Sequence, residues 1–468
     1  MRKTKIVCTL GPACDDEKVL KRMIGAGMNV ARLNLSHGAH DEHEKRIKVI
    51  REIGPEVAIM VDLQGPRIRT GHLKDTKVEL KTGSRISLTS EIIQGDEKTI
   101  SVSPPGVISA VKTGETILLA DGTIKLKVIV KKAGRIECLV QRGGPLGEQK
   151  GVNLPETDLA LPSLTAKDKA DVAWAVEQKV DYLALSFVRK SDDVLTLKKL
   201  LHGHKALIPV IAKIEKAEAV RNLKSIVEVS DGIMVARGDL GVEISLEKVP
   251  VIQKEILETC QVMEKPAIVA TQMLESMVKD ASPTRAEVSD VANAIFDGTD
   301  AVMLSEETSI GEYPVGSVET MGRIALEAEK KMKFRPRAVM ADGNIDIAVA
   351  HAACVLAQVV RAKAIITFTE TGSTALRVSK HRPDVPILGV VTNKRTLRRL
   401  ALFFGVRPVM IGSFRYIDEM LLKTEKAILA SDFLKKGDPV VITAGVPVHI
   451  PGTTNLIKVH RIGERKTL

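Results

Sequence analysis

Residues 206–241 read ALIPVIAKIEKAEAVRNLKSIVEVSDGIMVARGDLG. The segment alternates a near-continuous apolar run, a stretch with the apolar spacing of an amphipathic helix, and a second apolar run. Apolar runs of this kind are typical of strands that are buried on both faces of a parallel sheet. The segment therefore predicts a strand–helix–strand unit in which each strand ends in charged residues.

The same alternation recurs along most of the chain. The predicted strands lie within residues 5–12, 29–38, 56–65, 181–190, 206–215, 231–241, 265–272 and 299–308. Capping boxes predict the starts of two helices, at Thr165 with Asp168 and at Thr284 with Glu287. About eight strand–helix units in roughly 230 residues predict a (β/α)8 barrel, the TIM-barrel fold of the α/β class.

Two further domains are expected outside this pattern. Between residues 66 and 162 the sequence changes to short segments of period-two alternation, with turn signals such as Asp121-Gly122. This predicts a small all-β domain, a β-barrel lid, inserted after the third strand of a catalytic barrel at residues 1–65 and 163–337. After a basic, proline-containing linker at residues 330–339, strand and helix patterns return and predict a smaller doubly wound α/β domain at residues 338–468.

Composition narrows the class of protein. The 468 residues are 44% hydrophobic, 27% charged and 3% aromatic, with a formal net charge of +11. These values are typical of a globular protein and exclude a disordered chain or a disulfide-rich miniprotein. The positive charge favours anionic partners, whereas the shortage of aromatic residues argues against a platform for single-stranded nucleic acid.

The expected compartment is the cytoplasm. The five cysteines are scattered and form no CxxC motif, which favours a reducing compartment and gives no zinc site. No apolar run approaches the roughly 20 residues that span a bilayer, and the apolar part of the first 12 residues is too short for a signal peptide. We therefore expect no membrane among the partners, and the shortage of aromatic residues argues against a nucleic acid.

Polar side chains gather at the predicted strand ends, where barrel enzymes place their active sites. The candidates are Arg32, Asn34 and Ser36 on strand two, Asp62 after strand three, Lys213 and Glu215 on strand five, Gly238 and Asp239 after strand six, and Thr271 after strand seven. Glu215 and Asp239 end neighbouring strands and suit Mg²⁺ or Mn²⁺. With Lys213 beside them, they suit the transfer of a phosphoryl group or the stabilisation of an enolate. A buried lysine–glutamate salt bridge that only holds the strands is the alternative.

Two backbone segments are candidate anion sites. Gly238 lets a ligand approach the backbone, and the helix that follows offers N–H groups to a carboxylate or phosphate; a plain tight turn is the alternative. In the last domain a loop rich in hydroxyl groups follows a strand and opens a helix, where it could cradle an effector phosphate; an ordinary N-cap loop is the alternative. The hydroxyl residues of this loop are Thr369, Thr371, Ser373 and Thr374.

Several motifs resemble those of the pyruvate kinases. They are TKIVCTLGPA (4–13), GMNVARLNLSHG (27–38), DLQGPRIRTG (62–71), KGVNLP (150–155), SDGIMVARGDLGVE (230–243), ATQMLESM (270–277) and PTRAEVSDVANAIFDGTDAVMLSEET (283–308). They run in order through the predicted barrel, and IAKIE followed by MVARGDLG is highly specific. The resemblance implies a homotetramer that transfers a phosphoryl group from phosphoenolpyruvate to ADP, giving pyruvate and ATP.

The resemblance also implies roles for single residues. Glu215 and Asp239 would hold the divalent metal, Lys213 would neutralise the transferring phosphoryl group, and Arg32 would contact that phosphate. The substrate carboxylate would be seated by Thr271 with the backbone of Gly238 and Asp239, and Thr271 and Ser186 would lie near the proton relay to the enolate. The nucleotide side would include Asn34, His37, Arg69 and Lys150, with no catalytic role for His37.

Two departures from the family pattern bear on ions and effectors. The family's monovalent cation site, usually for K⁺, is matched by Asn34, Ser36, Asp62 and the Leu63 carbonyl. Potassium-requiring members resemble DTKGPE where this chain reads DLQGPR, with Leu63, Gln64 and Arg67. A guanidinium at Arg67 could replace the charge of K⁺, so we expect weak or absent K⁺ dependence. Glu370 stands where members that respond to fructose 1,6-bisphosphate resemble lysine, which argues against that effector and leaves a monophosphate open.

Two other classes of function are alternatives. A different metal-dependent barrel that handles an enolate, of the aldolase or lyase type, would not need the phosphate contacts of Lys213 and Arg32 and would show no dependence on ADP. A non-enzymatic basic binding protein would lack the set of polar residues at the strand ends, and this set is intact in the chain.

Overall fold

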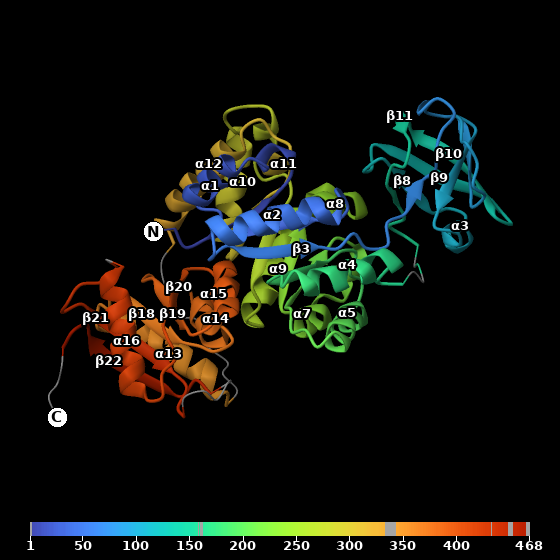
Figure 1. The fold of residues 1–468 in the computed structure, drawn as a ribbon. Coiled ribbons are helices and arrows are strands. Elements are labelled where there is room, and N and C mark those ends of the chain that lie inside the picture. The colour runs from blue at the N-terminus through green and yellow to red at the C-terminus, as the bar shows by residue number, and fades with distance from the viewer. Residues whose placement is uncertain are drawn as a thin grey trace.

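A closed barrel of eight parallel strands forms the centre of the molecule (Figure 1). This computed structural model describes residues 2–157, 159, 162–332, 343–431, 433–447 and 453–464. The barrel strands follow one another in chain order around the ring: β1 (Lys5–Thr9), β2 (Val30–Asn34), β3 (Ala58–Asp62), β13 (Tyr182–Leu185), β14 (Val210–Ile214), β15 (Gly232–Ala236), β16 (Ala267–Ala270) and β17 (Ala301–Leu304). Each strand lies within its predicted segment, so the predicted TIM barrel is confirmed.

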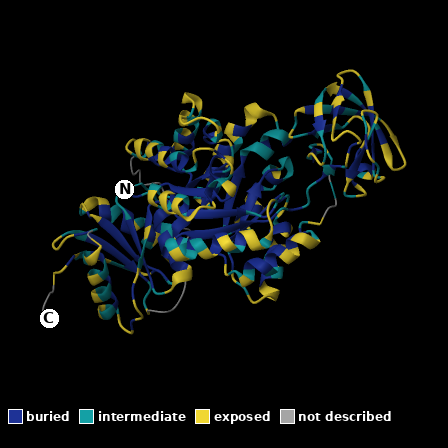
Figure 2. Cartoon of the chain, turned by 45° about the horizontal axis from the view of Figure 1, so that its top comes forward, coloured by how far each residue is buried: buried dark blue, intermediate teal, exposed yellow. Residues whose placement is uncertain are grey.

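Helices surround the barrel, and every residue of β1, β3, β14 and β15 is buried (Figure 2). The helices and 3-10 turns of this region are η1 (Pro12–Cys14), α1 (Glu17–Ala26), α2 (His40–Ile53), α4 (Ala166–Glu177), α5 (Ser191–Gly203), α6 (Ala217–Arg221), α7 (Leu223–Val229), α8 (Arg237–Glu243), η2 (Leu246–Lys248), α9 (Val249–Val262), η3 (Glu275–Val278), α10 (Arg285–Phe296), α11 (Glu306–Ser309) and α12 (Pro314–Glu329). Both predicted capping boxes are present, Thr165 with Asp168 before α4 and Thr284 with Glu287 before α10. The apolar runs are thus strands whose two faces are covered by barrel interior and helices.

The chain leaves the barrel after β3 and builds a β domain before it returns at α4 (Figure 1). Its elements are β4 (Arg69–Thr70), β5 (Lys77–Leu80), β6 (Arg85–Thr89), β7 (Thr99–Ser103), α3 (Val107–Ala110), β8 (Thr116–Leu119), β9 (Ile124–Lys132), β10 (Arg135–Arg142), β11 (Gly144–Gly147) and β12 (Val152–Asn153). Seven strands form a sheet in the order β12-β8-β9-β10-β6-β7-β4, and β11 pairs with β5. A bridge between Arg69 and Gly151, and a 3.0 Å hydrogen bond from the Val152 N–H to the Ile68 carbonyl, bring the two edges of this sheet together.

The last part of the chain forms a five-stranded sheet in the order β20-β19-β18-β21-β22. Its elements are α13 (Ile345–Val359), β18 (Ala364–Phe368), α14 (Ser373–Lys380), β19 (Ile387–Val391), α15 (Lys394–Arg399), η4 (Leu400–Leu402), β20 (Val406–Met410), α16 (Ile417–Ala430), β21 (Pro439–Ala444) and β22 (Leu456–Arg461). Ile365 packs in a core with residues of α13 and α14, whereas Ile366 packs in a core with residues of α16. Helices therefore cover both faces of the sheet, as the doubly wound prediction requires, and only β22 runs antiparallel. The predicted linker at 330–339 lies largely outside the described residues.

The C-terminal domain contacts the amino ends of the barrel strands. Asp300, which precedes β17, forms a 2.6 Å ion pair with Lys380 of α14. The Tyr182 hydroxyl at the start of β13 donates to the Arg399 carbonyl at 2.6 Å. This arrangement leaves the carboxyl ends of the strands to the inserted domain and to the candidate site.

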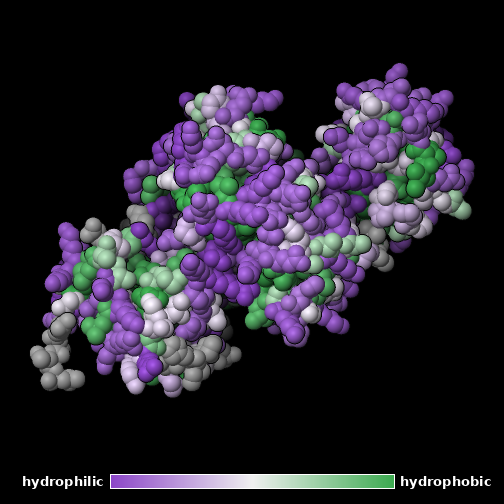
Figure 3. All heavy atoms as spheres, viewed as in Figure 1, coloured by the Kyte–Doolittle hydropathy of each residue, from purple (hydrophilic) through white to green (hydrophobic). Residues whose placement is uncertain are grey.

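The visible surface is dominated by polar side chains, with smaller apolar areas between them (Figure 3). Among the residues that the structure describes, no helix combines the length and the apolar character needed to cross a membrane.

Candidate active site

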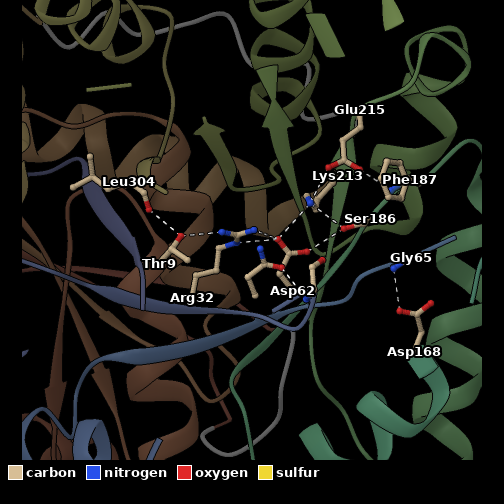
Figure 4. A network of polar contacts seen from close by, with 12 residues as sticks. Thr9, Arg32, Asp62, Gly65, Asp168, Ser186, Phe187, Lys213, Glu215 and Leu304 are labelled. Atoms are coloured by element: carbon tan, nitrogen blue, oxygen red, sulfur yellow. Dashed lines mark hydrogen bonds and ion pairs between the residues drawn. The ribbon is translucent and has the colours of Figure 1, made fainter. Parts of the chain in front are cut away.

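A buried network of charged side chains lies at the carboxyl ends of the barrel strands (Figure 4). Arg32 of β2 contacts Asp62 Oδ2 through Nη2 at 2.6 Å and through Nε at 2.9 Å. Lys213 Nζ of β14 lies 3.3 Å from the same oxygen and 2.7 Å from Glu215 Oε1. Lys213 also donates to Ser186 Oγ at 2.9 Å, and that hydroxyl donates to Asp62 Oδ1 at 3.1 Å. Residues from four strands thus meet, as expected when parallel strands close into a barrel.

The charged groups in this network stabilise one another's ionised forms. Asp62 is 1% exposed, and burial alone would raise its pKa, but the charges of Lys213 and Arg32 outweigh burial and lower the pKa. Burial opposes the charge of Lys213, yet Asp62 and Glu215 raise its pKa above the ordinary value. The alternative reading, a buried lysine–glutamate salt bridge, is therefore present in the structure. It does not account for the whole site, because two carboxylates beside Lys213 are not fully hydrogen-bonded by the described residues.

Those carboxylates belong to Glu215 and Asp239. Glu215 Oε2 accepts the Phe187 N–H at 2.7 Å, whereas its buried Oε1 pairs with Lys213 without hydrogen-bond geometry. Burial raises the pKa of Glu215, and the charge of Asp239 raises it further. Asp239 is half-buried and forms no hydrogen bond or ion pair with any described residue. Among the described residues, no group of three or more His, Cys, Asp or Glu could hold a metal. The carboxylates of Glu215 and Asp239 follow the neighbouring strands β14 and β15, and such a pair suits an ion that completes its shell with water and substrate.

A strained turn after the next strand, β16, lies against Gly238. Thr271 and Gln272 both have left-handed backbones, with φ of 68° and 54°. The Gly238 N–H donates to Thr271 Oγ1 at 2.8 Å, so in this structure that N–H is already used. Arg237 donates to the Thr271 carbonyl at 2.8 Å and pairs with Asp290 of α10 at 2.6 Å. Sequence reasoning alone identifies no role for Arg237, although its position directly after a buried strand is a signal.

The candidate residues for a monovalent cation lie on the neighbouring strands β2 and β3. Asn34 and Asp62 are paired in the sheet register, and Asn34 Oδ1 accepts the Ser36 N–H at 3.1 Å. Leu63 is buried and its N–H donates to the Ala184 carbonyl at 3.0 Å. The Asp62 carboxylate contacts two cationic side chains, those of Arg32 and Lys213.

The candidate nucleotide residues gather where the barrel meets the inserted domain. His37 is exposed, and partial burial together with the positive charges of Arg67, Arg69 and Arg32 lowers its pKa. Arg69 contacts the Gln149 carbonyl at 3.4 Å, next to the exposed Lys150. The structure thus brings several cations to the rim of the network.

Comparison with known proteins assigns the chain to a family. The family model described as pyruvate kinase, barrel domain, matches residues 1–318, and the pyruvate kinase alpha/beta domain matches residues 347–460. The chain belongs to the pyruvate kinase family. It is 48% identical over 474 residues to a pyruvate kinase of Geobacillus stearothermophilus and 46% identical over 475 residues to one of Sporosarcina psychrophila, covering 99% of this chain and 81% of each relative. The crystal structure of a pyruvate kinase from Cryptosporidium parvum matches with a TM-score of 0.93 at 38% identity, over 98% of this chain and 96% of that one.

Membership of the pyruvate kinase family makes this chain a phosphotransferase. The inferred resemblance is confirmed, and the aldolase or lyase alternative is not favoured. The role of each single residue rests on the geometry described above.

The hydroxyl-rich loop lies in the C-terminal domain, before α14. Thr369 Oγ1 accepts the backbone N–H three residues on, at 2.9 Å, and the hydroxyls of Thr371 and Ser373 lie 3.2 Å apart. Thr374 Oγ1 lies 2.7 Å from the hydroxyl of Thr454. The N-cap residue of α14 is Gly372, and no side chain of the loop caps the helix. Thr371 and Ser373 remain at the outer side of the loop.

Proposed function

We propose that this chain catalyses the transfer of the phosphoryl group of phosphoenolpyruvate to ADP, giving pyruvate and ATP, as a step of glycolysis in the cytoplasm. One observation carries the proposal: Lys213 and Arg32 converge on Asp62 beside the carboxylates of Glu215 and Asp239. Cations and a metal-ready carboxylate pair at one strand end suit an in-line transfer between two anions, which depends mainly on positioning and charge stabilisation.

Glu215 and Asp239 would hold Mg²⁺ or Mn²⁺, which when bound supplies a Lewis acid for the carboxylate and enol oxygens of the substrate. The ammonium of Lys213 is held in place by Asp62 and Glu215. Its positive charge would stabilise the phosphoryl group during transfer. Arg32 contacts the same phosphate from β2. Because both cations are held before the substrate arrives, little reorganisation is needed at the moment of transfer.

The carboxylate of the substrate would be seated at Thr271 and the backbone of Gly238 and Asp239. The present bond from the Gly238 N–H to the Thr271 hydroxyl would then be exchanged for a bond to the substrate. Ser186 lies between Lys213 and Asp62 in a chain of hydrogen bonds. We propose that Ser186 and Thr271 lie near the path by which a proton reaches the enolate.

On the nucleotide side, we propose that Arg69 and Lys150 contact the phosphates of ADP as the inserted domain closes, with Asn34 and His37 nearby. Both cations belong to the inserted β domain and stand at its junction with the barrel.

We further propose the domain boundaries 1–65 with 163–337, 66–162, and 338–468, and a homotetrameric assembly.

The reaction is tested by a coupled assay for pyruvate formed from phosphoenolpyruvate, with ADP and Mg²⁺ each supplied or withheld. Pyruvate formation that requires both supports the proposal. Formation that proceeds without ADP would favour an enolate-handling lyase instead.

We propose that activity depends weakly or not at all on K⁺. Asp62 already faces Arg32 and Lys213, and the charge of Arg67 reaches the same rim of the site. Initial rates should therefore be similar in K⁺, Na⁺ and tetramethylammonium at matched ionic strength, and Arg67→Glu should introduce a K⁺ requirement. A large K⁺ activation of the unaltered enzyme would defeat the idea.

We propose that the loop before α14 binds a monophosphate effector through Thr369, Thr371, Ser373 and Thr374. Glu370 lies within the loop, and its charge disfavours a bisphosphate. Candidate monophosphates should shift the substrate response of the unaltered enzyme, and Ser373→Ala should weaken that shift. If no monophosphate changes the response, the loop is structural only.

A further inference from the structure

A second charged region lies at the opposite end of the barrel, where the amino ends of the strands meet β20. A cavity of about 570 Å³ opens there, remote from the strand ends that carry the proposed active site. Its charged lining residues are Arg2, Lys5, Arg323, Arg407, Glu56 and Glu319. Four cationic side chains against two carboxylates favour an anion in this cavity.

Lys5 is an unusual lysine within this group. It opens β1, is 7% exposed, and its Nζ donates to the Val406 carbonyl at 2.6 Å. Among the described residues it forms no ion pair with a carboxylate, although Glu329 of α12 is near enough to raise its pKa. Burial nevertheless lowers the pKa of Lys5 to about 7, and the charges of Arg2 and Arg407 act in the same direction. A substantial fraction of this amine is therefore neutral and nucleophilic at neutral pH, unlike an ordinary lysine with a pKa of about 10.4.

Arg2 offers a hydrogen-bond donor in the same cavity. Its Nη2 donates to Asn29 Oδ1 at 2.7 Å and to the Gly27 carbonyl. Its Nε–H is buried and has no acceptor in the part of the chain that the structure describes. A buried donor without an acceptor is costly, so an anion formed beside it would be stabilised.

We propose that Lys5 is a carbamylation site, at which the ε-amine takes up dissolved carbon dioxide and the resulting carbamate is held in this cavity. The Nζ lone pair attacks the carbon of CO₂, an N–C bond forms as one C=O π bond opens, and one proton passes from nitrogen to solvent. Nothing is oxidised or reduced. The carbamate keeps one N–H for the Val406 carbonyl, and its new carboxylate can accept the Arg2 Nε–H. An acyl donor would give a neutral amide, which adds no negative charge to balance the cationic lining. The cavity therefore favours CO₂.

The experiment exposes the full-length protein to ¹³C-bicarbonate at neutral to mildly alkaline pH. A trialkyloxonium salt then traps any carbamate as its ester, and peptide mass mapping locates it. The unaltered protein should carry the ester at Lys5 and show one carbamate ¹³C signal. Lys5→Arg keeps a hydrogen-bond donor and a positive charge but has no neutral amine, so both the ester and the carbamate ¹³C signal should be absent. Lys21→Arg, at an exposed lysine paired with Glu17, is the matched control and should keep them.

Arg2→Gln removes the guanidinium but leaves Lys5, and should reduce the trapped fraction several-fold. The proposal is overturned if the unaltered protein carries no ester at Lys5, or carries it equally at ordinary lysines such as Lys21.

A second measurement needs no variant and so does not depend on the folding of Lys5→Arg. Competitive labelling of the unaltered protein with acetic anhydride over a range of pH gives the apparent pKa of each amine. Half-maximal reactivity of Lys5 near neutrality supports the proposal, whereas a value close to that of Lys21 contradicts it.

Discussion

At the scale of single residues, Asp62 holds the cationic side chains of the proposed site in position. One of its oxygens faces both Arg32 and Lys213, and the other accepts the Ser186 hydroxyl. Removing one partner from a buried charge network leaves the others uncompensated and typically costs about 3–5 kcal/mol. The positions of the two cations that would meet the phosphoryl group therefore depend on this carboxylate.

Asp62→Asn should lower the thermal midpoint at neutral pH and lower activity with it. The pKa of Asp62 is depressed in the folded protein, so its stabilisation is fully present above the unfolded value of about 3.9 and is lost as pH falls through the folded value. The difference in midpoint between the two proteins should be constant from pH 7 to about pH 5 and should shrink below about pH 4.

Asp192→Asn serves as the control, because its ion pair with Lys190 is exposed at 3.5 Å and exposed pairs contribute about 0–1 kcal/mol. An unchanged midpoint for Asp62→Asn at neutral pH would contradict the role given to the network.

At the scale of elements, the start of α4 links a helix cap to the proposed site (Figure 4). Asp168 Oδ2 accepts the Thr165 N–H at 2.8 Å, which closes the capping box. Its other oxygen accepts the Gly65 N–H at 3.0 Å, in the turn that leads from β3 to Arg67. Gly65 has φ of 71°, and a Cβ there would lie 2.9 Å from the ring of Phe187. The cap thus fixes the turn that carries Arg67.

Thr165→Ala and Asp168→Ala should therefore separate stability from activity. Thr165→Ala should cost about 1 kcal/mol, the usual value of an N-cap side chain, and leave the kinetic constants unchanged. Asp168→Ala should also raise the KM for ADP, because the turn that precedes Arg67 and Arg69 loses its anchor.

Thr284→Ala, at the cap of α10, is the matched control for stability alone. Equal KM values for ADP in all three variants would show that the cap does not position the turn.

The sequence predicted those features that depend on neighbouring residues. Apolar runs predicted the barrel strands, and the capping boxes predicted the starts of α4 and α10, because both patterns are local. The bond from Asp168 to Gly65 and the clamp of Arg237 on the Thr271 carbonyl join residues far apart in the chain. Such contacts depend on how the barrel closes, so no spacing in the sequence indicates them.

At the scale of the whole molecule, the barrel separates two tasks. Its carboxyl ends face the inserted domain and hold the proposed catalytic network, whereas its amino ends are fixed to the C-terminal domain through buried pairs such as Asp300 with Lys380. The domain order was predictable from changes in pattern along the chain. The antiparallel direction of β22 and the seating of Lys5 against β20 were not, since both are set by tertiary packing.

The central claim is that Lys213 stabilises the transferring phosphoryl group beside the metal-binding carboxylates of Glu215 and Asp239, and Lys213→Met tests it most directly. Coupled assays should show a fall in kcat of at least about 10²–10³-fold, because the preorganised charge at the transferring group is lost. Circular dichroism should report an intact fold, and Lys198→Met, which removes a partly exposed ion pair with Asp231, should keep full activity. A folded Lys213→Met enzyme whose kcat matches that of the unaltered enzyme would contradict the account.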